Sequence, residues 1–288
     1  IMKRYIKNML LASAAVMTLC GLSACIDETV PTDEATPATI KTDSKSLSYL
    51  ANSLPSFLTT WNTYNSGDYT QDWGYPCQMY MRDLLCADFP QSDNSFNYWD
   101  YIEDGSSLRY AYYYTFYYYY VFIKNANGVI SVGKDAVDGG NEAAKKYLGQ
   151  GYGYRAMLYL DLERLFEYKK TGVSYLDKQA DSIGCMGITI PIVTEKTSKV
   201  ELKNNPCAPF YTMNRFIMTD LNRAEENLAG YNREHKAFMD QSVIYGLKTR
   251  LWLDMATRFE KNPADLQKQI EAENADDGYD NLGISSAL

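Results

Sequence analysis

The chain has 288 residues, of which 46% are hydrophobic and 22% charged, and this balance is typical of a globular protein with a sizeable core. Its formal net charge of −8 and the lack of a stripe rich in Lys and Arg argue against nucleic-acid binding, which requires cations to neutralise phosphates. Tyrosine occurs 26 times, and its side chain combines a large apolar ring with a polar tip.

The N-terminal segment is typical of a secretory signal. Three basic side chains within the first seven positions precede an uncharged run, residues 8–24, whose apolar part is too short to span a bilayer. Removal of this segment would take away three positive charges and bring the formal charge near −11. We therefore expect residues 1–24 to be a signal peptide.

The signal ends in Leu22-Ser23-Ala24-Cys25, which resembles the lipobox of bacterial lipoproteins. In such proteins the Cys thiol receives a diacylglycerol, the preceding peptide is cut, and the new amine is acylated. Several acyl chains anchor stably, because each buried methylene contributes about 0.8 kcal/mol and a single chain is only marginal. We expect a lipid on Cys25 and a flexible tether over residues 25–46, in which Asp27 and Glu28 resemble an acidic signal for export to the cell surface.

Two helices are predicted after the tether. Apolar residues at helical spacing predict the first over Leu47–Tyr64, and Asn65-Ser66-Gly67 would end it. Pro76 stands where a helix can begin, and Met79–Phe89 continues as the second helix.

Aromatic and short polar side chains gather in the connections around the second predicted helix. Such a mixture suits a sugar, whose C–H faces stack on rings while its hydroxyls form hydrogen bonds, although a small satellite core would have the same composition. The candidate ligand-binding residues are Trp73, Tyr75, Asn97, Trp99, Asp100 and Tyr101. The following segment, Tyr110–Tyr120, is aromatic around a whole helix, which predicts burial between two layers.

A repeat organises the remainder of the chain. The segment Tyr152–Glu167 returns as Tyr245–Glu260 with the same glycine, leucine, aspartate and Phe-Glu positions. Each copy follows a matching upstream segment, Phe116–Ile123 and Phe210–Ile217, so the unit is a helix pair. In the first copy, apolar residues and Arg155 share one stripe with Gly151, and glycines there predict a close approach of neighbouring helices.

No catalytic or metal-binding constellation stands out. His235 is the only histidine and lies in a charged connection, where we expect it to be solvated, and no paired Cys motif is present for zinc. The glycines around Gly151 lack the spacing of a dinucleotide loop, and Ala275 stands where a calcium loop needs an oxygen ligand. We expect no cofactor and no enzyme activity; Cys185 and Cys207 flank an insertion and can be considered for a disulfide in an exported protein.

The lipobox, the segment Tyr154–Phe166, the run Ile188–Glu195 and the second repeat copy together resemble the SusD/RagB family. The segment Phe122–Asn127 is similar to the helix that precedes the family's signature, although Glu167-Tyr168 replaces its usual glycine. The resemblance implies a surface-exposed outer-membrane lipoprotein that binds glycans, or in some cases peptides, and closes over a TonB-dependent, SusC-like transporter. Family members are nearly twice this length, so the resemblance also implies that the C-terminal part is missing.

The predicted fold is all-α, made of stacked helix hairpins of tetratricopeptide-like type with long loop insertions, over residues 47–288. A short strand-like run, Gly187–Val193, lies in the insertion. The helices of the hairpins and the one after them are predicted over Leu108–Val132, Glu142–Glu167, Pro209–Leu228, Phe238–Glu260 and Pro263–Ala275. Two functions remain open besides glycan uptake: a RagB-like peptide-binding component and an α-helical scaffold whose only partners are proteins. A glycosidase would be a third, distinguished by product release.

Overall fold

Helices dominate the part of the chain that the structure, a computed structural model, describes. This part comprises residues 44–60, 74–85, 108–261, 271 and 275–283, and it lies within one unit, Ala38–Leu288. Cys25 and the tether residues before Ala38 lie outside the described residues. The elements are α3 (Ser44–Phe57), α4 (Tyr75–Leu85), α6 (Leu108–Asp138), the 3₁₀ turn η1 (Glu142–Ala144), α7 (Lys145–Phe166), α8 (Ser174–Ser182), β1 (Ile188–Pro191), the 3₁₀ turn η2 (Glu201–Asn204), β2 (Cys207–Pro209), α9 (Phe210–Asn227) and α10 (Gln241–Lys261).

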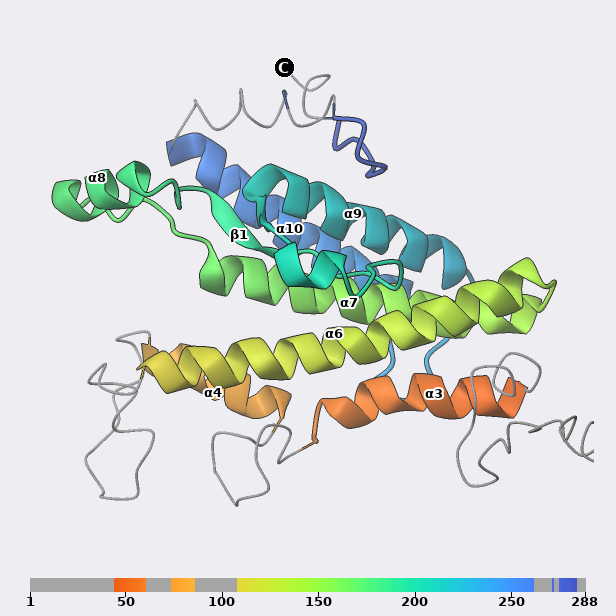
Figure 1. Cartoon of the computed structure of the whole chain (residues 1–288). Coiled ribbons are helices and arrows are strands. Elements are labelled where there is room, and N and C mark those ends of the chain that lie inside the picture. Colours follow the sequence, from red (N-terminus) through yellow and green to blue (C-terminus); the bar gives the residue numbers. More distant parts are fainter. Residues whose placement is uncertain (1–43, 61–73, 86–107, 262–270, 272–274, 284–288) are drawn as a thin grey trace, which may run out of the picture. The chain divides into compact units, whose positions relative to one another are not determined.

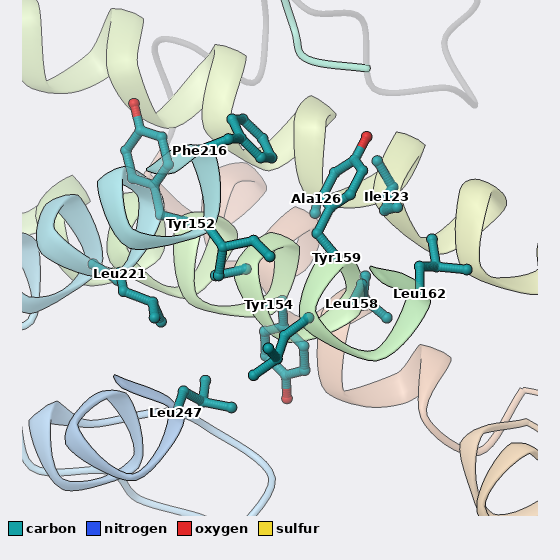
Figure 2. Packing of buried hydrophobic residues seen from close by; sticks show 14 of the residues in the cluster. Ile123, Ala126, Tyr152, Tyr154, Leu158, Tyr159, Leu162, Phe216, Leu221 and Leu247 are labelled. Atoms are coloured by element: carbon teal, nitrogen blue, oxygen red, sulfur yellow. The ribbon is translucent and has the colours of Figure 1, made fainter. Parts of the chain in front are cut away.

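Helix α7 is the centre of this arrangement. It packs mainly against α6 and α9, and it also contacts α3, α10 and β1 (Figure 1). Leu148, Leu158 and Leu162 of its predicted stripe are buried. Figure 2 shows Tyr154 and Tyr159 leaving opposite sides of α7, and burial of such rings on both sides contributes much of the core. The all-α fold predicted from the helix-pair repeat is therefore confirmed.

The glycines of α7 allow its neighbours to come close. A Cβ atom added at Gly151 would lie 2.8 Å from Cγ1 of Ile130 on α6, and one added at Gly153 would lie 2.7 Å from Sδ of Met239. Both separations are shorter than Cβ contacts in proteins, so an alanine at either position would force the neighbouring side chain to shift. The predicted close approach of neighbouring helices is confirmed.

The two repeat copies have different surroundings. Tyr159 and Leu160 are buried in α7, whereas Trp252 and Leu253, at the same repeat positions in α10, are 40% and 60% exposed. Helix α7 has neighbours on several sides, while within the described residues α10 packs mainly against α9, with fewer contacts to α7. The sequence repeat therefore gives two similar helices with unequal burial.

Most predicted helix boundaries differ from the observed ones by a few residues. Helix α10 begins at Gln241 rather than Phe238, because the Asp240 carboxylate accepts the Val243 N–H at 3.1 Å and caps the helix there. Helix α3 ends at Phe57, before the predicted Tyr64. The predicted helix Pro263–Ala275 lies outside the described residues except at its helical Glu271 and at Ala275.

The insertion contains a short antiparallel pair of strands. Within β1 and β2, Ile188 pairs with Pro209 and Pro191 pairs with Cys207. Cys185 lies before β1, and both it and Cys207 are free thiols, so the considered disulfide is not formed. His235 is exposed, as predicted.

Candidate functional site

The structure describes Tyr75 among the sequence-predicted site residues. Cys25, Trp73, Asn97, Trp99, Asp100 and Tyr101 lie outside the described residues. Tyr75 is the first residue of α4, and its backbone N–H donates to the carbonyl of Leu58 at 2.9 Å, which joins α4 to the end of α3.

The Tyr75 side chain reaches a buried carboxylate. Its hydroxyl donates to Oδ2 of Asp161 on α7 at 2.6 Å, and its ring lies edge-on to Tyr119 of α6 with centroids 6.4 Å apart. Burial and the charge of Asp161 raise the pKa of Tyr75, so the hydroxyl remains a protonated donor. Tyr75 is thus fixed by packing, and a sugar-stacking role for its half-buried ring stays a prediction.

Asp161 is the centre of a polar cluster that joins four helices. It is fully buried and accepts further hydrogen bonds from Tyr119 at 3.2 Å, Arg82 of α4 at 3.0 Å and Arg250 of α10 at 3.3 Å. Burial opposes the charge of Arg82, but Asp161 outweighs it and raises the pKa of this guanidinium. Since the carboxylate is compensated and closed to solvent, it positions α4 rather than contacting a substrate.

The sequence contained a signal for this cluster. Aspartate is identical in both repeat copies, at Asp161 and Asp254, and it stands where a tetratricopeptide helix would have a small residue. In the second copy, Asp254 lies 3.6 Å from Arg164 and 3.5 Å from Lys169, both of which are more exposed. A charged residue that is repeated within an apolar stripe predicts a buried ion pair. The mismatch with the tetratricopeptide pattern does not by itself indicate such a pair.

The N-terminal half of α6 presents an aromatic surface. Tyr112, Tyr113, Phe116 and Tyr117 are between 37% and 54% exposed, so the prediction that the whole Tyr110–Tyr120 segment fills the core is wrong for these four residues. Further along the helix, Tyr118 and Tyr119 are buried, and α6 packs against α3 and α7. The aromatic segment therefore contributes some rings to the core and leaves others at the surface.

The exposed rings are held in defined positions. The Phe116 ring lies 4.4 Å from that of Tyr120 and 5.6 Å, edge-on, from that of Phe166 at the end of α7, and Tyr112 lies 5.9 Å from Phe166. Rings fixed on helices can stack on the apolar faces of a ligand without a large loss of side-chain entropy. In the sequence, this aromatic surface follows the candidate residues Asn97 to Tyr101 after residues 102–111.

A second buried network holds the insertion against the helices. Arg155 of α7 donates to Oε2 of Glu195 at 2.6 Å and to Oδ1 of Asn127 on α6 at 2.8 Å, and it also pairs with Asp220 of α9. Asn127 in turn donates to the carbonyl of Val193 at 3.0 Å. The start of the segment after β1 is therefore fixed to α6, α7 and α9 by charged and amide groups.

Two further findings concern metal ions and membranes, and both hold for the described residues. No group of three or more His, Cys, Asp or Glu side chains there is placed to hold a metal ion. None of the described helices combines the length and the apolar character needed to cross a membrane.

Comparisons with known proteins give a likeness to a solved structure. No family model and no curated protein matches the sequence. Among solved structures, the chain is similar to a SusD-like carbohydrate binding protein from Bacteroides vulgatus, with a TM-score of 0.59 and 20% sequence identity. The match covers 80% of this chain and 45% of that protein, so the chain spans less than half of its length. The chain therefore has a SusD-like fold over the 80% of its residues that the match covers.

Proposed function

We propose that this protein binds glycan nutrients as a SusD-like, non-catalytic component of an uptake system. The observation that carries the proposal is the fold, which matches a protein described as carbohydrate binding over 80% of this chain. The exposed aromatic surface of α6 supports it, because sugars stack their C–H faces on such rings.

The ligand site of this proposal combines the sequence candidates with α6. Trp73, Tyr75, Trp99 and Tyr101 supply rings, and Asn97 and Asp100 supply hydrogen-bond partners. Tyr112 and Phe116 add further rings from α6, the helix that follows these candidates in the chain. Rigid elements that support polar, turn-rich connections are a common way of building a binding site.

Anchoring and delivery form the second part of the proposal. A lipid on Cys25 holds the protein in the outer membrane, and Asp27 and Glu28 direct it to the cell exterior. There the protein delivers bound oligosaccharide to a SusC-like TonB-dependent transporter. This part is supported by the lipobox and by the family resemblance of the sequence.

Ligand binding is tested by affinity electrophoresis of the full chain in gels that contain individual polysaccharides, with a parallel series of peptides measured by calorimetry. Retardation by at least one polysaccharide is expected. Retardation by none, together with binding of a peptide, would replace the glycan with a RagB-like peptide ligand. Binding of neither would favour a scaffold with protein partners.

Anchoring is tested with Cys25→Ala. This variant should no longer incorporate labelled fatty acid, and it should leave the membrane fraction. If Cys25→Ala fractionates with membranes as the unchanged protein does, the anchoring proposal is wrong.

A further inference from the structure

A polar cleft lies between α3, the first turns of α7 and the connection from α9 to α10. Its volume is about 550 Å³, within the range of roughly 300 to 1,000 Å³ that small-molecule sites occupy. Figure 1 shows the connection, in light blue, reaching from α9 and α10 toward α3. The cleft shares no residue with the candidates Trp73 to Tyr101 or with the aromatic surface of α6.

The wall formed by the connection is fixed by hydrogen bonds to α7. The buried side-chain amide of Gln150 accepts the N–H of Met239 at 2.8 Å and donates to its carbonyl at 2.6 Å. The Tyr154 hydroxyl donates to the carbonyl of Ala237. Within the connection, the His235 ring accepts the N–H of Ala237 at 3.2 Å. This wall is therefore formed before any ligand arrives.

The opposite wall is the C-terminal half of α3. The Tyr118 hydroxyl of α6 donates to the carbonyl of Phe57 at 2.8 Å, and the Tyr75 N–H holds the carbonyl of Leu58. Asn52 is exposed on this wall and faces the cleft together with Ser56. Both walls are thus tied to α4, α6 or α7, which keeps the cleft open without a ligand.

The groups that line the cleft suit a neutral, polyhydroxylated ligand. Tyr147 and Tyr231 provide half-buried rings, and Asn52 provides an amide for hydroxyl groups. Burial and the Glu234 charge raise the pKa of Tyr231, so its hydroxyl is a neutral hydrogen-bonding group.

Other ligand classes fit the lining less well. A purely apolar molecule would desolvate the amide and the charges without replacing their hydrogen bonds. A negatively charged ligand would be repelled by Glu234, and a positively charged ligand would be repelled by Lys146. We infer that the cleft between α3, α7 and the α9–α10 connection is an additional binding site for neutral oligosaccharide, separate from the proposed aromatic site.

The test blocks the cleft without removing a described interaction. In Asn52→Arg an exposed amide becomes a long side chain at the cleft wall, and Asn232→Arg is the matched control, since Asn232 is also exposed but does not line the cleft. The probes are maltohexaose, cellohexaose, xylohexaose and mannohexaose, each titrated by calorimetry into the full chain in detergent. Tyr147→Ala, which removes one ring, is compared with Tyr175→Ala at an exposed position of α8.

At least one probe should bind, and Asn52→Arg should abolish the binding event that Asn232→Arg leaves intact. Tyr147→Ala should weaken the same event roughly 3- to 10-fold, the loss expected for one stacking ring. The inference is overturned if none of the four probes binds, or if all binding persists in Asn52→Arg. Binding that Trp99→Ala removes and Asn52→Arg leaves intact would uphold the proposed function and reject this cleft.

Discussion

Arg155 and Asp220 form a two-pronged ion pair inside the protein, with Nε 2.6 Å from one carboxylate oxygen and Nη2 2.8 Å from the other. Both side chains are almost completely buried. Their opposite charges offset each other in a place that water does not reach. Burial opposes the charge of Arg155, but Asp220 and Glu195 outweigh it and raise the pKa of the guanidinium. The pair holds α7 to α9 at the centre of the fold.

Removing one partner of this pair should be strongly destabilising. Arg155→Met leaves the buried carboxylate of Asp220 without its main partner, and we expect the free energy of unfolding to fall by about 3 to 5 kcal/mol in a denaturant titration. Arg164→Met is the matched control on the same helix: its side chain is 43% exposed and lies 3.6 Å from Asp254, so a change below about 1 kcal/mol is expected. Equal, small effects of both variants would contradict a structural role for the pair.

The link between Arg155 and Glu195 should make the insertion sensitive to acid. Burial disfavours the Glu195 carboxylate, but the charge of Arg155 outweighs it and lowers the pKa of Glu195 in the folded protein. A lowered folded pKa contributes stability above the unfolded value of about 4.3, and this stability is lost as the pH falls through the folded value. Between pH 6 and pH 3 the unchanged protein should therefore lose more stability than Glu195→Gln. Parallel pH profiles of the two proteins would contradict this link.

Two helical glycines should respond to alanine with opposite signs. At Gly151 an added Cβ meets Ile130 at 2.8 Å, so Gly151→Ala should reduce the melting temperature through overpacking that costs about 1 to 3 kcal/mol. A Cβ added at Gly246 has no neighbouring atom within 4 Å, and Gly246→Ala should stabilise the protein by up to about 1 kcal/mol through helix propensity. A stabilising Gly151→Ala would show that α6 and α7 do not approach as closely as described.

The hydroxyl of Tyr75 should contribute to stability independently of ligand binding. Tyr75→Phe keeps the ring but removes a hydrogen bond to buried Asp161, at an expected cost of about 1 to 3 kcal/mol. Tyr49→Phe, at a position that is 73% exposed, should change stability by less than about 0.5 kcal/mol. If Tyr75→Phe weakens polysaccharide binding but leaves unfolding unchanged, the hydroxyl acts on the ligand and not on Asp161.

Sequence reasoning found the helix pairs because their signal is local and repeated. The stripe that includes Leu148 and Leu158 and the crowding at Gly151 follow from helical periodicity and from the cost of glycine in a helix. The exposed half of the aromatic segment was not predictable in this way. Tyr112 and Tyr119 lie two turns apart on nearly the same side of α6, and their different burial depends on how much of the length of α6 its neighbours cover.

The polar clusters required contacts between distant segments. Asp161 is joined to Arg82 and Arg250, which are 79 and 89 residues away along the chain, and neither pair has a local pattern. The cleft beside α3 likewise combines segments that periodicity treats separately, with Asn52, Tyr147 and Tyr231 on three of them. Sequence patterns indicate which faces are buried, whereas such pairings depend on tertiary packing.

The most direct measurement of the central claim is a calorimetric titration of polysaccharide into the full chain and into Trp99→Ala. Sugar stacking on Trp99 predicts saturable binding to the unchanged protein and a loss of about 0.5 to 1.5 kcal/mol, beyond lost contact area, in the variant at an unchanged melting temperature. A core tryptophan would instead cost about 3 to 5 kcal/mol of folding stability and lower the melting temperature. Saturable binding that Trp99→Ala weakens at constant melting temperature is the predicted result, and the absence of binding to every polysaccharide tested would contradict the account.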